Sequence, residues 1–372
     1  MKRFQEDIIT RDLNKKMVFI TGPRQVGKTS LAQAISAGVE NSVYLNYDNL
    51  SHRDIIRQAA WLPVTELLIL DELHKMAEWK NYLKGLYDTK SPNLKILVTG
   101  SARLDTFRQS GDSLAGRFFR HRLNPLSLAE IPDAGAAELE RLLLRGGFPE
   151  PYLAENDDDA KRWRLQYIDG LIRHDILDFE KVHDFKAIQL TLDLLRRRVG
   201  SPLSWTSLAR DVNCAPNTIK RYVEILEALF IIFRVTPHHR NIGRSLLKEP
   251  KIYFYDTGMV IGGEGIRLEN LVAVSLLKHL DWLEDSKGQR CELRTLRTKE
   301  GKEVDFVMAI DDVPELIIEV KLSDATLSPA LQYFHKKYSL QAVQVIKNLS
   351  TERLLNGIPL RRATSFLNEL AA

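Results

Sequence analysis

An eight-residue phosphate-binding motif near the amino terminus constrains this chain more than any other feature. Residues 22–29, Gly-Pro-Arg-Gln-Val-Gly-Lys-Thr, match G-x-x-x-x-G-K-S/T between a predicted strand, Met17–Thr21, and a predicted helix. In this context, backbone N–H groups curl around the β- and γ-phosphates of a nucleotide at the helix amino terminus, and the lysine adds a point charge. The N-terminal part of the chain is therefore predicted to bind ATP together with Mg²⁺.

The expected nucleotide contacts fill the whole loop and the first helical turn. The hydroxyl of Thr29 is the expected Mg²⁺ ligand. The predicted contacts are Gly22, Pro23, Arg24, Gln25, Val26, Gly27, Lys28, Thr29 and Ser30. A chance match in a structural turn is the alternative, but it leaves the next two motifs unexplained.

Two adjacent carboxylates follow a buried strand further along the chain. The apolar run 67–70 ends in Asp71 and Glu72, the arrangement of a Walker B motif. Asp71 is expected to hold Mg²⁺, and Glu72 is expected to orient and deprotonate the attacking water. Capping of a helix that begins near Leu73 is the alternative, but it does not explain a pair of acids after a buried apolar run.

A third apolar run, Lys95–Thr99, is predicted to lie between the two motif strands in the sheet. A polar residue at its end would reach the water and the γ-phosphate, and Thr99 and Ser101 are equal candidates. Either residue could instead satisfy a turn. Beyond this strand, Arg117 is the first candidate and Arg120 the second for an arginine that acts on a neighbouring subunit's γ-phosphate. The alternative for both is an ordinary surface arginine.

The N-terminal pattern predicts an α/β fold. Short apolar runs alternate with amphipathic stretches over 17–100, which is typical of βα units around a buried parallel sheet. We expect a P-loop ATPase core over 1–145, and 372 residues allow two or three domains. No apolar run is long enough to span a membrane, and the first residues do not form a signal peptide, so a cytoplasmic protein is expected. Cys214 and Cys291 are expected to be unpaired reduced thiols.

The segment 146–258 is expected to form a helical lid followed by a winged helix. Predicted helices at 206–211 and 217–230 flank a break that ends at Pro216, and two β-type runs follow. Six Lys or Arg residues and one acid lie within 194–222, a local charge of +5 that can bind a DNA backbone. The expected DNA contacts are Asn217, Thr218, Lys220, Arg221, His238, His239 and Arg240. A solvated surface is the alternative, and Arg196 to Arg198 could instead reach the nucleotide.

The motifs together resemble bacterial and archaeal AAA-type ATPases whose C-terminal half is a domain of unknown function. The resemblance rests on the nucleotide motifs at 20–29, 70–72 and 98–101, on Gly-Gly-Phe-Pro at 146–149, on Lys-Ile-Tyr-Phe-Tyr-Asp-Thr-Gly at 251–258 and on Leu-Glu-Asn at 268–270. It covers nearly the whole chain. The resemblance implies an AAA-like ATPase core, a winged helix and a restriction-endonuclease-like α/β domain over 259–372.

The C-terminal part carries a pattern similar to that of restriction-endonuclease-like nucleases. Asp305 precedes a turn and a strand that contains Glu319 and Lys321. Alternation along a strand puts Glu319 and Lys321 on one face, beside Asp305 on the hairpin partner. Asp305, Glu319 and the upstream Glu269 are expected Mg²⁺ ligands, and Lys321 could position water or stabilise developing charge. The pattern also fits a binding module that keeps this shape without cutting.

Two functions follow from these predictions. The first is a Mg²⁺-dependent ATPase that binds and remodels DNA as a homo-oligomeric ring, with a nuclease domain that is either active or inactive. The second is an ATP-gated switch whose C-terminal domain only holds a nucleic acid or protein partner. The intact Glu72 favours turnover of ATP over pure switching.

Overall fold

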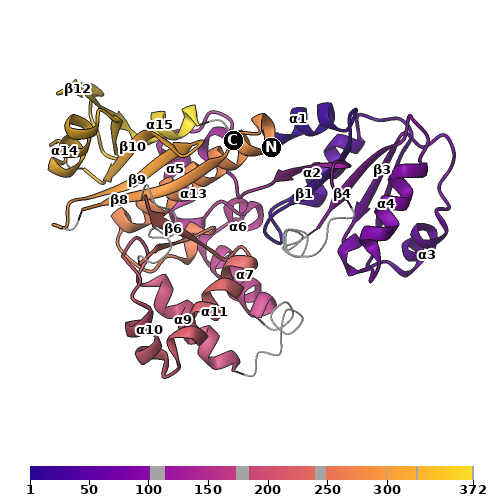
Figure 1. The fold of residues 1–372 in the computed structure, drawn as a ribbon, viewed down its shortest axis with the longest axis horizontal. Helices are drawn as coiled ribbons and strands as arrows, with labels where there is room; N and C mark the ends of the chain where they lie inside the picture. The colour runs from indigo at the N-terminus through magenta and orange to yellow at the C-terminus, as the bar shows by residue number, and fades with distance from the viewer. Residues whose placement is uncertain (101–113, 173–183, 239–248, 299, 324–325, 371–372) are drawn as a thin grey trace. The chain divides into compact units, whose positions relative to one another are not determined.

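The computed structural model of the chain describes residues 1–100, 114–172, 184–238, 249–298, 300–323 and 326–370 (Figure 1). By their contacts these residues form two compact units, Met1–Asn124 and Pro125–Ala372. The nucleotide motifs lie in the first unit, and the predicted DNA-binding and nuclease-like segments lie in the second.

The first unit is built on a five-stranded, all-parallel sheet with the strand order β2-β3-β4-β1-β5. Its strands are β1 (Met17–Thr21), β2 (Ser42–Asn46), β3 (Leu67–Asp71), β4 (Lys95–Thr99) and β5 (Phe118–Arg122). Strand β4 lies between β1 and β3, which confirms the predicted place of the third motif strand. The sequence pattern did not predict β5, which coincides with the arginine-rich segment.

Helices cover both faces of this sheet, because each buried strand presents alternate residues to opposite sides. The helices are α1 (Gln5–Asp12), α2 (Lys28–Ser36), α3 (Leu50–Gln58) and α4 (Trp79–Thr89). Phe19, Leu70 and Val98 share one core cluster with Ile56 of α3 and Leu83 of α4. Helices α1 and α2 contact the sheet through other residues. The predicted α/β P-loop core is therefore present.

The second unit begins with short helical segments and then a three-helix group. The helices are α5 (Ala136–Arg145), α6 (Pro149–Leu153), α7 (Asp157–Gly170), α9 (Phe185–Arg196), α10 (Trp205–Val212) and α11 (Pro216–Ala228). Helices α9, α10 and α11 contact one another. Helices were predicted at 206–211 and 217–230, close to the observed α10 and α11. Ile219, Val223 and Leu226 of α11 are buried, as their helical spacing predicted.

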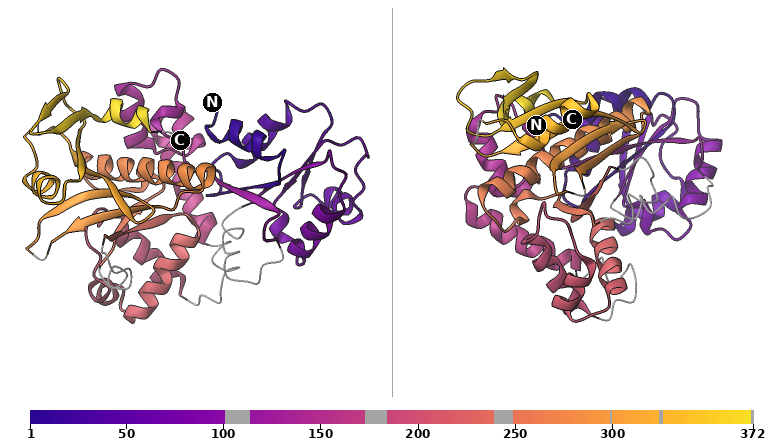
Figure 2. Two further views of the ribbon diagram at one scale, coloured as in Figure 1. Left: turned by 45° about the horizontal axis from the view of Figure 1, so that its top comes forward. Right: turned by 60° about the vertical axis from the view of Figure 1, so that its left-hand side comes forward.

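An eight-stranded sheet occupies the rest of the second unit, in the order β12-β13-β11-β10-β9-β8-β6-β7. The strands are β6 (Ile232–Pro237), β7 (Lys251–Phe254), β8 (Cys291–Arg297), β9 (Glu303–Ile310), β10 (Val313–Lys321), β11 (Gln341–Ile346), β12 (Arg353–Leu355) and β13 (Ile358–Arg362). Figure 2 shows helix α13 (Glu264–Lys287) lying along this sheet, where it contacts β7 to β10. Helices α14 (Pro329–Tyr338) and α15 (Ala363–Glu369) complete the fold. No helix in the described ranges is both long and apolar enough to cross a membrane.

The strand pairing crosses a predicted domain boundary. Thr236 of β6 pairs with Arg294 of β8, so the hairpin expected to form the wing belongs to the same sheet as the strands after residue 258. The other expected boundary, after Arg145, lies inside the second unit, since the break in contacts comes after Asn124. The sequence pattern could not show that β6 and β8 share a sheet, because their pairing joins residues far apart in the chain.

Three of the family-like motifs meet in one structural junction of the second unit. The Arg164 Nε atom donates a 2.7 Å bond to Oδ2 of Asp256, and both side chains are buried. A Cβ at Gly146 would overlap the Asp256 carboxylate, and one at Gly258 would overlap the Arg164 guanidinium. The Asn270 amide bonds the backbone of β7 in both directions, at 2.8 and 2.9 Å. These motif residues therefore hold α7, β7 and α13 together.

Candidate functional site

The phosphate-binding loop connects β1 to α2 and has the geometry that its glycines require. Gly22 has φ 143°, and a Cβ there would overlap the backbone of Leu123, so no other residue fits. Gly27 has φ 99° and caps the amino terminus of α2. The Lys28 Nζ atom donates to the carbonyl oxygens of Gly22 and Pro23 at 3.0 and 2.5 Å. The loop thus forms a closed turn around the lysine at the carboxyl end of β1.

The remaining loop residues divide into a buried support and an open rim. Val26 is fully buried, whereas Arg24 is half-buried and Gln25 and Ser30 are exposed. The carbonyl of Val26 accepts a 3.2 Å bond from the Arg3 guanidinium, which also donates to the carbonyl of Asn124. Sequence analysis missed Arg3, because it belongs to no nucleotide motif and reaches the loop only in the folded unit.

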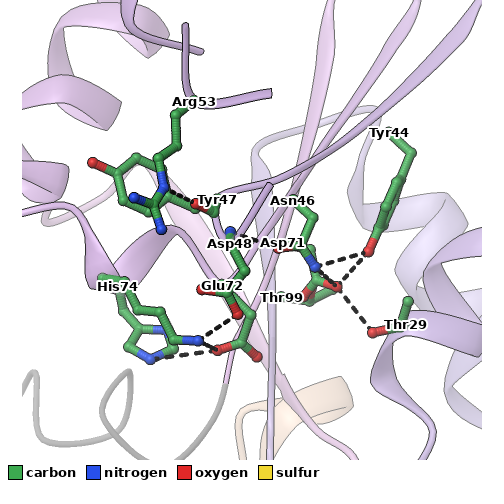
Figure 3. A network of polar contacts seen from close by, with 11 residues as sticks. Thr29, Tyr44, Asn46, Tyr47, Asp48, Arg53, Asp71, Glu72, His74 and Thr99 are labelled. Carbon is green, nitrogen blue, oxygen red and sulfur yellow. Dashed lines mark hydrogen bonds and ion pairs between the residues drawn. The ribbon is translucent and has the colours of Figure 1, made fainter. Parts of the chain in front are cut away.

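Asp71 is the centre of a polar network at the carboxyl ends of the strands (Figure 3). Its Oδ2 atom accepts from the hydroxyls of Thr29 at 2.9 Å and Tyr44 at 2.6 Å, and its Oδ1 atom accepts from Thr99. The Asn46 amide donates to the Tyr44 hydroxyl at 3.3 Å. Walker A and Walker B residues are therefore joined directly. Thr29 and Asp71 together supply the oxygen ligands that Mg²⁺ prefers, and they fit a Mg²⁺ ion bound with ATP.

Glu72 points away from this network, toward a basic corner (Figure 3). Its Oε2 atom lies 3.6 Å from Nε2 of His74 and 3.6 Å from Nζ of Lys75, and Lys75 also contacts Asp48 at 2.5 Å. Glu72 has a left-handed backbone, φ 56°, and its side chain makes no capping bond to the short helix that follows. Burial raises the pKa of its carboxyl, and the Lys75 charge partly opposes this. The pair of acids thus divides into Asp71, which faces Thr29, and Glu72, which lies apart from it.

The candidates for contact with the γ-phosphate lie in different places. Thr99 is buried and bonded to Asp71, whereas Ser101 lies outside the described residues. The Arg117 guanidinium donates two hydrogen bonds to the Asp88 carboxylate, from Nε at 2.8 Å and from Nη2 at 3.1 Å. Arg117 directly precedes β5, at the amino ends of the strands, and Arg120 lies within β5. Neither arginine is at the sheet edge that carries its own chain's phosphate-binding loop.

The C-terminal pattern comes together on the hairpin of β9 and β10, with α13 beside it. Asp305 accepts a 2.9 Å bond from the backbone N–H of Val320, between the two other pattern residues. Glu319 Oε1 lies 2.8 Å from Nζ of Lys321. The other oxygen of Glu319 is buried without a hydrogen-bond partner among the described residues. Glu269 reaches the same cluster from α13. The predicted juxtaposition is present.

Lys251, for which the sequence predicted no role, lies among these acids. The Lys251 Nζ atom lies 2.6 Å from Glu303, 3.6 Å from Glu269 and 3.8 Å from Asp305, measured to carboxylate oxygens. The Tyr253 hydroxyl donates to Glu269 at 2.7 Å. Lys251 is the first residue of the motif at 251–258. The motif was visible in the sequence, but the acids that contact Lys251 were not. Residues two apart on β7 and on β9 meet here, as strand alternation requires.

The electrostatics of this carboxylate cluster reflect burial and mutual repulsion. Burial raises the pKa of Asp305 well above its usual value, and the charges of Glu269 and Glu319 add to the shift. Burial also raises the pKa of Glu269. For Lys251, burial acts to lower the pKa, but the neighbouring carboxylates outweigh it and the pKa is raised. Lys251 is therefore a charged ammonium at neutral pH.

The expected Mg²⁺ ligands of the C-terminal part do not fit a metal ion in this arrangement. The ammonium of Lys251 already lies 3.6 Å from Glu269 and 3.8 Å from Asp305, two acids that a metal ion would have to share. Across the described ranges, no group of three or more His, Cys, Asp or Glu side chains is placed to hold a metal ion.

The predicted DNA-contacting residues of α11 lie at its exposed start. Asn217, Lys220 and Arg221 are exposed, and Thr218 is partly exposed. His238 is partly buried and bonds β8 through its backbone, while His239 and Arg240 lie outside the described residues. Two of the other basic residues are engaged nearby. Arg198 contacts Asp211 at 2.5 Å, and Arg196 donates to the carbonyl of Met259 at 2.8 Å.

Family comparisons agree with the N-terminal fold. Residues 14–132 match the family described as AAA domain. Residues 136–268 and 264–361 match two families that are both described as domains of unknown function, DUF8612 and DUF4143. Together with the parallel sheet and the phosphate-binding loop, the first match supports a P-loop ATPase domain in the N-terminal unit.

Similar proteins occur in bacteria and archaea. An uncharacterized protein of Mycobacterium tuberculosis is 29% identical over 248 residues, which are 66% of this chain and 55% of that protein. An uncharacterized protein of Haemophilus influenzae is 25% identical over 338 residues, covering 80% of this chain and 82% of that protein. The chain thus spans little more than half the length of the mycobacterial relative. A Walker-type ATPase of Pyrococcus abyssi aligns with a TM-score of 0.44 and 16% identity, over 71% of this chain and 96% of that one.

Proposed function

We propose that this chain hydrolyses ATP with Mg²⁺ and uses the reaction to act on DNA as a homo-oligomer. The bond between Thr29 and Asp71 is the observation that carries the ATPase part, because it brings the two nucleotide motifs to one point. Asp71 is held from β2, α2 and β4, so its carboxylate is already oriented toward the hydroxyl of Thr29.

Each residue of the site has a chemical task in this proposal. Lys28 neutralises the β- and γ-phosphates, and backbone N–H groups of the loop bind their oxygens. Thr29 and Asp71 would hold Mg²⁺, which would offset the charge on the phosphates. Glu72 orients the attacking water and accepts its proton, a task helped by a pKa that burial has raised toward neutrality.

The DNA part of the proposal rests on the start of α11. Lys220 and Arg221 are exposed there beside Asn217, while the opposite side of the helix is buried in the three-helix group. A helix with a buried side and an exposed, basic amino-terminal turn can enter a DNA groove and neutralise phosphates. The oligomer part of the proposal rests on Arg117, which pairs with Asp88 outside its own nucleotide site and would serve a neighbouring site.

One experiment tests substrate and activity together. ATP hydrolysis is measured for the full chain alone and with duplex, single-stranded and branched DNA at constant salt. We expect Mg²⁺-dependent hydrolysis that one of these DNA forms stimulates several-fold. Hydrolysis that no DNA form changes would contradict the DNA part and leave the ATPase part standing, whereas no hydrolysis in any condition would contradict both.

A second candidate is the ATP-gated switch, whose C-terminal part holds a partner without cutting it. The position of Lys251 favours this role for the C-terminal part, because the ammonium fills the place of a catalytic metal. A metal-dependent nuclease at Asp305, Glu319 and Lys321 is the competing reading of the same residues. It requires Mg²⁺ or Mn²⁺ to enter the carboxylate cluster.

A further inference from the structure

Four carboxylates and two lysines form one cluster in the second unit, and each acid has at least one hydrogen-bond or ion-pair partner. Glu269 contacts Lys251 and Tyr253, and Glu303 contacts Lys251 and Arg297. The remaining acids are held within the hairpin of β9 and β10. Asp305 accepts from a backbone N–H of β10, and Glu319 contacts the lysine two residues after it.

We propose that Lys251 is the resident cation of this carboxylate cluster, and that it excludes the divalent metal that a nuclease would need. This inference deepens the proposed function, because it makes the C-terminal part a module that holds its partner and does not cut it. The ammonium partly neutralises the carboxylate charges, as a metal ion would, since it lies within 3.8 Å of three acids.

The backbone around Lys251 fixes the position of its ammonium. Lys251 pairs with Val235 on β6 and forms a bridge to Pro202 on its other side. Its side chain is only 5% exposed, so the ammonium is largely shielded from solvent by the described residues. Moving it out would bury several carboxylates without a cation, which is strongly unfavourable in a protein interior.

A divalent ion sharing these acids would also stand close to a positive charge. The Coulomb repulsion between two like charges a few ångströms apart is stronger inside a protein than in water, because the effective dielectric constant is lower. One feature shows where an ion could bind if the ammonium were absent. The Oε2 atom of Glu319 is buried without a hydrogen-bond partner among the described residues, although the side chain is 92% buried.

The test compares Mn²⁺ binding to the nucleotide-free full chain and its Lys251→Met variant, by calorimetry and by the electron paramagnetic resonance of free Mn²⁺. The wild-type chain and its Asp305→Asn variant should bind Mn²⁺ equally, because the cluster of the wild type holds no Mn²⁺. Lys251→Met should bind Mn²⁺ at the cluster at least roughly ten-fold more tightly than the wild type does, because one full positive charge is removed. Lys251→Met combined with Asp305→Asn should lose this binding again, which separates the cluster from the nucleotide site.

Lys336→Met is the control, because Lys336 is an exposed lysine of α14 that lies outside the cluster. It should bind no more than about twice as much Mn²⁺ as the wild type, since its charge is already screened by water. Equal Mn²⁺ binding by wild type and Lys251→Met would overturn the inference.

A second measurement needs only the wild-type fold, in case Lys251→Met does not fold. DNA is incubated with Mn²⁺ and either the wild-type chain, Asp305→Asn or Glu319→Gln. We expect the wild type to nick DNA no more than either variant does. A nick that either substitution removes would overturn the proposal. This outcome is independent of ATP hydrolysis, so it would leave the proposed ATPase untouched.

Discussion

The hydroxyl of Tyr44 donates a 2.6 Å hydrogen bond to Oδ2 of Asp71, the same oxygen that accepts from Thr29. Burial and this hydrogen bond raise the pKa of Tyr44 to about 12, so the hydroxyl remains a proton donor at every physiological pH. A tyrosine outside both nucleotide motifs therefore sets the direction of the Walker B carboxylate.

Tyr44→Phe should weaken the use of Mg²⁺ in ATP hydrolysis. A hydrogen bond to a charged group contributes roughly 1.5 to 3 kcal/mol, so we expect the half-saturating Mg²⁺ concentration to rise by about ten-fold or more. Steady-state hydrolysis over a Mg²⁺ titration measures this. Tyr82→Phe is the control, because it removes a 2.7 Å bond to the carbonyl of Ile56, away from Asp71. If both variants shift equally, Tyr44 acts only through stability.

Glu72→Gln should bind ATP and fail to hydrolyse it. The amide keeps the size of the side chain but cannot accept the proton of the attacking water, and general base catalysis contributes roughly 10² to 10⁴ in rate. Lys28→Ala should instead lose ATP binding, because its charge on the phosphates is removed. Equilibrium binding of a fluorescent ATP analogue and single-turnover hydrolysis separate the two. Normal turnover in Glu72→Gln would contradict its assignment.

The acid limb of the pH–rate profile should lie higher than that of an ordinary glutamate. Burial raises the pKa of Glu72, and the base must be deprotonated, so kcat/KM should fall as the pH drops through this raised value. Lys75 lowers the same pKa, and Lys75→Met should therefore move the acid limb to still higher pH. Lys84→Met, an exposed lysine on α4, is the control and should leave the profile in place.

Lys220→Glu combined with Arg221→Glu should weaken DNA binding and flatten its salt dependence. Each phosphate contact contributes about one to the slope of log K against log salt, so we expect the slope to fall by roughly two. Fluorescence anisotropy at several salt concentrations measures it. Lys161→Glu with Arg162→Glu makes the same charge change on exposed residues of α7 and should have a smaller effect. Equal slopes for both double variants would place the DNA contact elsewhere.

Arg117→Ala should bind ATP almost normally and hydrolyse it poorly, if Arg117 serves a neighbouring subunit. Such an arginine contributes roughly 10³ to 10⁵ in rate. Mixing Arg117→Ala with Lys28→Ala chains should restore part of the activity, since some interfaces then combine an intact loop with an intact arginine. Asp88→Asn keeps the arginine but removes its 2.8 Å ion pair, and it should remain active. No rescue in the mixture would remove the argument for action between subunits.

The nucleotide site could be predicted from the sequence because its residues follow strands that are buried on both faces. Such strands read as continuous apolar runs, and the polar residue after each run must lie at one edge of the sheet. Strand β5 could not be predicted in this way. Among the strands that the structure describes it pairs with β1 alone, at the edge of the sheet, and four of its five residues are partly exposed, so it shows no apolar run.

The carboxylate cluster could be predicted only in part. Asp305, Glu319 and Lys321 lie on adjacent strands of one hairpin, so local alternation was enough to bring them together. Lys251 meets them through the pairing of β6 with β8, which joins residues far apart in the chain. A lysine at the start of an apolar strand reads as a surface residue until that pairing is known.

The pairing of β6 with β8 also decides which fragments of this chain are worth making. A fragment cut at residue 259, where the sequence suggested a boundary, would lose β6 and β7 and leave β8 as an open sheet edge, a known cause of aggregation. It would also lack Lys251, and its acids would be buried without their cation. A nuclease assay on that fragment would therefore describe a different molecule from the full chain. Fragments of the second unit should begin near Pro125.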